Sequence, residues 1–406
     1  MLTNKRIALI TTWFPPQESV ATNRMVAFAE FLSEDFEVEV FCLDQIERSI
    51  TWNDSTKVHY SSSNKLFERL KDKQSDGTFL HKLKVGTRII LSKFIRNPLS
   101  KWQKSTFKKL ENSHKINPFD CIISSFSPQE AHLVAIEFKK KFPTIPWIAD
   151  MRDEMSANPY IDSTTKLTLE KVEKQVNEFA DAVTSVSEPI LTDFKRLLPK
   201  VQFFEEIRNG FNHQFIRNLN DNEKNSVFTL GYFGTFYGKR KPNILMQALS
   251  ELKQEYSDFD FIFEIVGAHR NFHIPNELQK NILISPNLPY LEAIEKMATF
   301  DCNVQLHPKS EQKGIFTGKL FDYISSQKPV LAFVDKTDVA AKLIEEFDCG
   351  YVAEFDQLQE NKKIILNAYE DWKQNKIKFA SDEQVASLHR KEQVNKLAEL
   401  IHKLTK

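Results

Sequence analysis

The chain has 406 residues with 55 basic and 55 acidic side chains, so its formal net charge at pH 7 is zero. This balance excludes the strong positive field by which many proteins hold nucleic acid. The length exceeds what one compact core supports and suggests about two α/β domains. The four cysteines lack the CxxC or His/Cys spacing of zinc sites and disulfide frameworks, which favours a reducing compartment.

The N-terminal stretch MLTNKRIALITTWF combines a basic pair with a short apolar run. Thr11, Thr12 and a double proline end that run early, so the stretch predicts a first strand rather than a signal peptide. No part of the chain reaches the roughly 18 uninterrupted apolar residues of a membrane-spanning helix. We therefore expect a cytoplasmic protein which, where it meets a membrane, lies peripherally on the inner face.

The first elements follow a strand–helix–strand order. Residues 5–11 and 37–43 have the apolar character of strands, and apolar positions at helical spacing predict a helix over 23–32. The connecting loop lacks the GxGxxG pattern of a dinucleotide site. Arg24, at the start of this helix, is either a ligand-binding residue or, the more frequent case, an ordinary solvated arginine.

A strongly basic segment covers residues 64–117. It holds fourteen Lys or Arg against four acids, a local net charge of +10, with apolar residues interleaved at helical spacing. An amphipathic basic segment suits an anionic membrane surface or a phosphorylated lipid. The alternative is a helical cover on the sheet with a solvated basic face.

Ionisable residues follow the next two predicted strands. Strand 119–126 leads into a helix that carries His132, and strand 147–150 ends in Asp150, Arg152 and Asp153. Because open α/β sheets bind ligands beyond the carboxyl ends of their strands, all four residues are site candidates. The alternatives are a partly exposed helix histidine and a structural ion pair between Arg152 and Asp153.

The second half begins with strand 228–233 and a glycine-bearing basic loop. This loop holds Gly234, Thr235, Arg240 and Lys241, and a helix starts at the proline that follows. Glycines after a strand, three consecutive cations and a helix start together predict a loop that binds an anion. A plain surface loop would also explain three basic residues.

A second glycine-bearing stretch covers residues 314–333. Gly318 lets a backbone approach an anion closely, and Thr317 is predicted to cap a helix whose N–H groups point at a phosphate. Lys319 adds a positive charge. One turn later, Asp322 is a candidate for accepting hydrogen bonds from ribose hydroxyls, although the two charges also suit an ordinary i,i+3 ion pair.

Composition places the domain boundaries. The polar, Asn-rich passage 217–226 reads as a linker between an N-terminal domain, 1–216, and a C-terminal domain, 227–380. Residues 381–406 are predicted to add an amphipathic C-terminal helix.

An Asp-x-Asp pair at Asp258 and Asp260 matches the metal motif of some sugar transferases. It precedes the predicted strand 261–267 and so lies at the wrong end of the sheet for ligand binding. We therefore expect no metal and no cofactor.

These motifs, in this order, resemble glycosyltransferase family 4, and in particular members that act in bacterial surface-polysaccharide assembly. The matching stretches span nearly the whole chain: RIALITTWFPP, PWIADMRDE, ADAVTSVSE, IRNGFN, LGYFGTFYGKRKP and GKLFDYISSQKPVLAF. The resemblance implies a GT-B fold, in which two Rossmann-like domains face each other across a cleft. It also implies hexosyl or N-acetylhexosaminyl transfer from a nucleotide sugar to a saccharide or lipid-linked acceptor, with retention at the sugar carbon.

The resemblance also assigns roles to the donor-side residues. Lys241 occupies the place of the cation that binds the donor diphosphate. Thr235 stands where the family often has arginine, so Arg240 or Lys319 substitutes for it. Of the two glutamates that the family places seven residues apart, Asp322 matches the second, which holds the ribose. Gly234 and Gly318 belong to the two anion-binding loops.

In the first of these two glutamate positions, which in the family contacts the sugar, this chain has Gly314. In the N-terminal domain the resemblance makes His132 and Asp153 the catalytic candidates for orienting or deprotonating the acceptor. Arg24, Asp150 and Arg152 become acceptor-side candidates. Two alternatives remain open at this point: a nucleotide-sugar epimerase of the same fold, and a noncatalytic scaffold protein.

Overall fold

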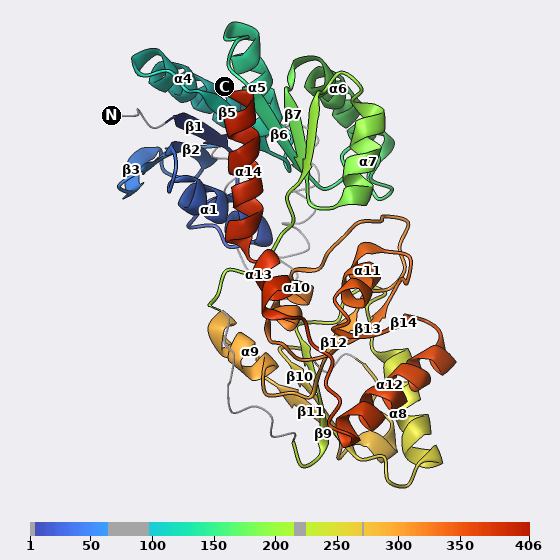
Figure 1. Cartoon of the computed structure of the whole chain (residues 1–406). Coiled ribbons are helices and arrows are strands. Elements are labelled where there is room, and N and C mark those ends of the chain that lie inside the picture. The colour runs from blue at the N-terminus through green and yellow to red at the C-terminus, as the bar shows by residue number, and fades with distance from the viewer. Residues whose placement is uncertain (1–4, 64–96, 215–224, 270–271) are drawn as a thin grey trace, which may run out of the picture. The chain divides into compact units, whose positions relative to one another are not determined.

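The computed structural model describes residues 5–63, 97–214, 225–269 and 272–406. The polypeptide forms two compact units, one of Met1–Ile207 with Val394–Lys406 (unit 1) and one of Arg208–Gln393 (unit 2). Each unit is built around its own mainly parallel β-sheet (Figure 1). The predicted α/β class with two Rossmann-like domains is therefore confirmed.

Unit 1 contains an eight-stranded sheet in the order β3-β4-β2-β1-β5-β6-β7-β8. Every neighbouring pair is parallel except β3 and β4, which form an antiparallel hairpin at one edge. The strands are β1 (Arg6–Ile10), β2 (Glu37–Leu43), β3 (Arg48–Asn53), β4 (Thr56–Ser61), β5 (Cys121–Ser125), β6 (Trp147–Arg152), β7 (Ala182–Ser185) and β8 (Phe203–Glu206).

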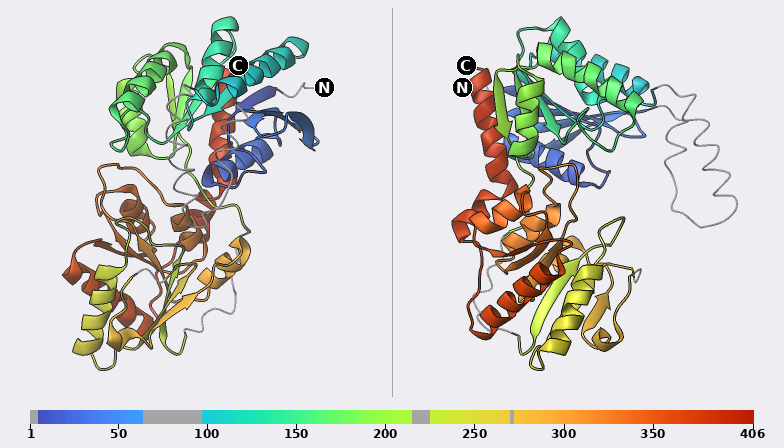
Figure 2. Two further views of the ribbon diagram at one scale, coloured as in Figure 1. Left: turned by 180° about the vertical axis from the view of Figure 1, so that it is seen from behind. Right: turned by 90° about the vertical axis from the view of Figure 1, so that its right-hand side faces the viewer.

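Helices cover both faces of this sheet, because side chains alternate along each strand and both sets are apolar. Ile7 and Leu9 of β1 pack with α1 and α14, whereas Ala8 and Ile10 pack with α4 to α7. Figure 2 shows α14 and the α4–α5 pair on opposite sides of the sheet. The helices are α1 (Val20–Leu32), α4 (Ser100–Ile116), α5 (Glu130–Lys141), α6 (Ser163–Phe179), α7 (Glu188–Leu197) and α14 (Arg390–Leu404).

Unit 2 contains a six-stranded, fully parallel sheet in the order β11-β10-β9-β12-β13-β14. One face packs against α8 and α12 and the other against α9, α10, α11 and α13. Its elements are β9 (Phe228–Phe233), α8 (Asn243–Glu255), β10 (Phe261–Val266), the 3-10 turn η1 (Asn276–Leu278), β11 (Ile282–Ser285), α9 (Tyr290–Met297), β12 (Cys302–Leu306), α10 (Gly318–Ser325), β13 (Val330–Val334), α11 (Val339–Glu346), β14 (Gly350–Glu354), α12 (Leu358–Lys373) and α13 (Asp382–Ser387).

The chain passes between the units at positions that differ from the predicted boundaries. The predicted linker, 217–226, lies almost entirely outside the described residues, and unit 2 already begins at Arg208. A side chain at Gly210 would lie 2.2 Å from the carbonyl oxygen of Leu388, and Phe211 forms an isolated β-bridge with His389. This close pairing holds the 208–214 segment on unit 2 and interrupts the predicted C-terminal helix between α13 and α14.

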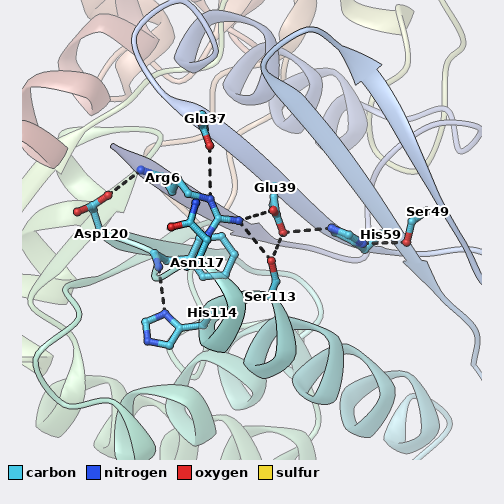
Figure 3. A network of polar contacts seen from close by, with 10 residues as sticks. Arg6, Glu37, Glu39, Ser49, His59, Ser113, His114, Asn117 and Asp120 are labelled. Atoms are coloured by element: carbon cyan, nitrogen blue, oxygen red, sulfur yellow. Dashed lines mark hydrogen bonds and ion pairs between the residues drawn. The ribbon is translucent and has the colours of Figure 1, made fainter. Parts of the chain in front are cut away.

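A buried polar network ties the hairpin edge of unit 1 to α4 (Figure 3). The Glu39 carboxylate on β2 accepts hydrogen bonds from Arg6 and from the Ser113 hydroxyl, and it lies 3.1 Å from His59 Nε2. Burial disfavours the Glu39 charge, but the hydrogen bonds from His59 and Ser113 outweigh burial and lower its pKa to about 2. The network thus fixes one end of α4 on the sheet as an ionised, fully paired cluster.

Of the predicted basic segment, residues 64–96 lie outside the described part of the chain. The remainder forms α4, which buries Trp102, Thr106, Leu110 and His114. Within the described residues, no helix combines the length and the apolar character needed to cross a bilayer.

Candidate functional site

The loop that follows β9 approaches the start of α10 very closely. Gly234 has a φ of +104°, and a side chain at this position would lie 2.3 Å from Lys319 Nζ. Only glycine therefore combines this backbone conformation with the passage of the lysine. The sequence places both residues in anion-binding loops, and the structure brings the two loops together.

Lys319 lies half-buried on α10, with its ammonium over the ring of Tyr232 at 5.2 Å from the centroid. Among the described residues no acid pairs with this ammonium. Burial, followed by the positive charge of Arg240, lowers the pKa of Lys319 to about 8. An anion bound between Lys319 and Arg240 would relieve the repulsion between these two partly desolvated cations.

Arg240 reaches the same place from the loop before α8. Its Nη2 donates to His307 Nδ1 at 2.7 Å, which puts the ring proton of a neutral His307 on Nε2. Burial and then the Arg240 charge lower the pKa of His307, which favours its neutral form. Arg240 Nε is buried and has no hydrogen-bond partner among the described residues, so this guanidinium retains unused donors.

The start of α10 is open beside these two cations. Thr317 occupies the predicted N-cap position, but its hydroxyl accepts from Gln305 Nε2 at 2.8 Å and bonds no helix N–H. The prediction of a side-chain cap is therefore wrong, because Gln305 at the end of β12 takes the hydroxyl. A side chain at Gly318 would meet nothing within 4 Å, so there is room for a ligand at this helix end.

Asp322 lies one turn beyond Lys319 on α10. Its Oδ1 accepts the Tyr290 hydroxyl at 2.8 Å and lies 3.9 Å from His213 Nε2, which in turn is 3.0 Å from the Ser325 hydroxyl. Burial raises the pKa of Asp322 to about 6, although the Tyr290 hydrogen bond opposes this rise. The carboxylate is thus held in place through Oδ1, whereas Oδ2 makes no hydrogen bond or ion pair with the described part of the chain.

Two predicted donor-side residues stay outside this cluster. Lys241 and Thr235 are both exposed, and neither side chain makes a hydrogen bond or ion pair with another residue of the described part of the chain. The loop turns at Gly238 and closes with a hydrogen bond from the Arg240 amide to the Tyr237 carbonyl. This turn directs Arg240, rather than Lys241, toward His307.

In unit 1, Arg24 and Asp150 are interior residues. They are 3% and 0% exposed, and the Arg24 guanidinium donates twice to the Asp150 carboxylate, at 2.8 and 3.1 Å. Ser125 and Thr184 also donate to this carboxylate, at 2.8 and 2.9 Å. Arg24 is therefore neither at a ligand surface nor solvated, and with Asp150 it fastens α1 to three strands.

Arg152 lies where β6 ends in a register shift against β7, and it has a φ of +57°. The Ser185 hydroxyl donates to its carbonyl at 2.7 Å, which holds this unusual backbone. Its guanidinium lies 4.0 Å from the half-exposed carboxylate of Asp153. The predicted pairing of these two residues is therefore present, and Asp153 remains accessible.

His132 is completely buried in α5. Trp147 Nε1 donates to the Ser124 hydroxyl at 2.8 Å, and that hydroxyl lies 2.7 Å from His132 Nδ1. Burial lowers the pKa of His132 to about 4, so the imidazole is neutral at pH 7. His132 is therefore neither at a ligand surface nor the partly exposed histidine of the alternative, because Phe126 and Trp147 pack around the ring.

The Asp-x-Asp pair that resembles a metal motif lies at the N-terminal end of β10, as predicted. Asp258 pairs with Lys373 at 3.1 Å, and Asp260 accepts from the backbone N–H of Phe261, where β10 begins. In the described ranges, no group of three or more His, Cys, Asp or Glu side chains is arranged to hold a metal ion.

Comparison with known proteins finds no matching family model and no matching curated sequence. Solved structures match over the whole chain. Sucrose-phosphate synthase from Thermosynechococcus elongatus has a TM-score of 0.67 at 13% identity, over 98% of this chain and 99% of that one. HepE from Anabaena, solved in complex with UDP-glucose, has a TM-score of 0.61 at 16% identity over 98% and 99%. A glycosyltransferase from Rickettsia africae has a TM-score of 0.61 at 13% identity over the full length of both chains. These likenesses show the two-domain GT-B fold.

Proposed function

We propose that this chain is a glycosyltransferase that takes its sugar from a nucleotide-sugar donor bound to unit 2. The observation that carries the proposal is the meeting of Arg240 and Lys319, with no acid paired to the lysine in the described structure. A diphosphate would neutralise both cations and offset the cost of their desolvation. The likeness to HepE, which binds UDP-glucose, supports the same class of donor.

The neighbouring groups supply the other contacts that such a donor needs. The open start of α10 would add backbone N–H groups to the diphosphate, and the free Oδ2 of Asp322 would accept ribose hydroxyls. As the glycosidic bond breaks, negative charge grows on the leaving diphosphate. Arg240 and Lys319 would stabilise this charge without a metal ion.

A calorimetric titration of the full chain with a panel of nucleotide sugars tests the proposal. We expect nucleotide sugars with one particular nucleobase to bind with a measurable dissociation constant, and the corresponding free nucleobase not to bind. If no nucleotide sugar and no nucleoside diphosphate binds at millimolar concentration, the proposal is wrong.

The affinity for a nucleotide sugar should be greatest between about pH 6 and about pH 8. Protonation of Asp322, with a pKa raised to about 6, removes a ribose acceptor below this range, and loss of the Lys319 proton above a pKa of about 8 removes a positive charge. Each single-proton event lowers the affinity by up to about tenfold per pH unit. Calorimetry at several pH values measures the profile.

The ligand for this profile is the nucleotide sugar, because a free nucleoside diphosphate has a terminal phosphate that itself titrates near pH 6. Asp322→Asn should remove the acidic limb and leave the alkaline limb. An acidic limb that persists in this variant would assign the titration to another group.

We further propose retention at the transferred carbon and a saccharide or lipid-linked acceptor, in line with the family 4 resemblance. Asp153 is the better placed of the two predicted catalytic residues, because its carboxylate is half-exposed whereas His132 is buried and neutral. NMR of the anomeric proton in the product would distinguish retention from inversion.

A role in surface-polysaccharide or glycolipid assembly would bring the protein to a membrane. The exposed lysines Lys101, Lys104 and Lys108 form one stripe on α4. Co-sedimentation with anionic vesicles should therefore be lost in the Lys104→Glu/Lys108→Glu variant and at raised salt. The matched variant Lys166→Glu/Lys171→Glu on α6 should sediment like the wild type, and equal losses in both variants would refute a specific α4 surface.

A further inference from the structure

Unit 1 has a pocket of about 450 Å³ that lies wholly within it. One wall is the loop after β5, residues 126–130, and another is the loop after β6, from Asp153 to Ile161. The first turns of α6 complete it. The volume is in the range of sites for small molecules, and none of the donor-side residues described above belongs to this pocket.

The lining of this pocket carries negative charge. Among the described residues it includes the carboxyl groups of Glu130, Asp153 and Glu154 and no Lys, Arg or His side chain. The Arg152 guanidinium lies 4.0 Å from the Asp153 carboxylate but does not line the pocket. Such a lining repels phosphate and other anions and favours a neutral or positively charged ligand.

The buried polar atoms of the pocket require hydrogen-bond donors. Glu130 is 7% exposed, and its carboxyl makes no hydrogen bond to the side chain of another described residue. Gln129 Oε1 is also buried and has no partner in the described part of the chain. The Glu130 carboxyl receives a hydrogen bond from its own backbone N–H, so Gln129 Oε1 is the buried acceptor that a ligand would satisfy with an N–H or O–H group.

A positively charged donor suits Glu130 best. Burial raises the pKa of this carboxyl, because the surrounding protein solvates its charge less well than water does. An ammonium group at hydrogen-bond distance would stabilise the ionised form through a charge-assisted hydrogen bond. Apolar walls from Met155, Ile161 and Leu169 complement the C–H face of a sugar ring, and three threonines of α6 add hydroxyl groups.

We propose that this pocket binds a sugar that carries a free amino group, with the ammonium on Glu130 and ring hydroxyls toward Asp153 and α6. If the proposed glycosyltransferase function holds, the amino sugar belongs to the acceptor. The binding itself rests only on the pocket in unit 1 and does not require a donor.

Ligand-observed NMR and calorimetry on the full chain, without any nucleotide, test this proposal with glucosamine as the probe. We expect glucosamine to bind at least tenfold more tightly than glucose or N-acetylglucosamine, and glucose 6-phosphate not to bind. Glu130→Gln should weaken glucosamine binding at least tenfold, and Asp153→Asn should weaken it less. Glu137→Gln, an exposed acid on the same helix, should leave it unchanged.

Equal affinity for glucosamine, glucose and N-acetylglucosamine would overturn the proposal. So would unchanged binding in the Glu130→Gln variant, or preference for glucose 6-phosphate. Because nucleotide sugars are absent from these titrations, a failure here leaves the donor site standing. Conversely, a failed donor panel leaves the amino-sugar result intact.

Discussion

Nucleotide-sugar binding should fall by about 10- to 100-fold when either Arg240 or Lys319 is replaced by methionine, and by about 100- to 10,000-fold when both are replaced. Each side chain would lose charge-assisted hydrogen bonds to the diphosphate, worth about 1.5–3 kcal/mol each. The loop between β9 and α8 keeps its fold in these variants, because its turn is made by backbone hydrogen bonds and by Gly238. Calorimetry with the nucleotide sugar selected from the panel measures the loss.

Two lysines of the same loop give informative comparisons, Lys239 as a matched control for charge and Lys241 as a test between two assignments. Lys239→Met removes an exposed cation from the same loop and should change the affinity by less than about threefold, since screened surface charges contribute little. Lys241→Met separates two accounts of the loop. The sequence resemblance assigns the diphosphate to Lys241, whereas the geometry assigns it to Arg240, so a larger loss in Lys241→Met than in Arg240→Met would contradict the site described here.

Asp150→Asn should destabilise unit 1 by about 3–5 kcal/mol, because it removes the buried carboxylate charge to which the Arg24 guanidinium donates twice. Burial disfavours the Asp150 charge, but Arg24 and the Ser125 hydroxyl hold the pKa of Asp150 below its usual range. The native carboxylate therefore contributes stability above the unfolded-state pKa, and this contribution is lost as the pH falls. Urea unfolding followed by tryptophan fluorescence measures the change, since four of the five tryptophans lie in unit 1.

Asp193→Asn is the appropriate comparison for this variant. Asp193 pairs with Arg196 at 3.1 Å on the exposed side of α7, and both side chains are solvated. Its loss should change the free energy of unfolding by less than about 0.5 kcal/mol. Equal stability of the Asp150→Asn and Asp193→Asn proteins would show that the Arg24–Asp150 pair is not structural.

Most of the fold could be predicted from the sequence because apolar runs mark buried parallel strands directly. The predicted strands at 37–43 and 228–233 coincide with β2 and β9. The hairpin of β3 and β4 was not predicted, because it is an edge feature with half-exposed, polar residues and so lacks an apolar run. The break between α13 and α14 depends on Gly210 and Phe211, which are distant in the sequence.

In the candidate site, likewise, residues in local sequence motifs were predicted, whereas residues brought in by distant segments were not. Local motifs identified Gly234, Arg240 and Lys319, and the structure brings these residues together. Sequence reasoning missed His307, Tyr290 and His213, although His307 directly follows β12 and could have been found from that position. The other two approach Asp322 from separate segments, and no local pattern records such contacts.

In unit 1, burial separates the predicted site residues that are structural from the one that remains accessible to a ligand. An arginine at a helix start, an aspartate at a strand end and a histidine on a helix look alike in sequence whether they face a ligand or the core. The hydroxyls of Ser124, Ser125 and Thr184, which satisfy Asp150 and His132 inside the protein, gave no signal of that role. Asp153 alone of the two catalytic candidates remains at an accessible position.

The central claim, a nucleotide-sugar site on unit 2, is tested most directly by a crystal structure of the chain with the nucleotide sugar that binds in the panel. The account predicts the diphosphate between the Arg240 guanidinium and the Lys319 ammonium at the start of α10, with a ribose hydroxyl on Asp322. A diphosphate bound elsewhere, or one that leaves both cations without a contact, would contradict it.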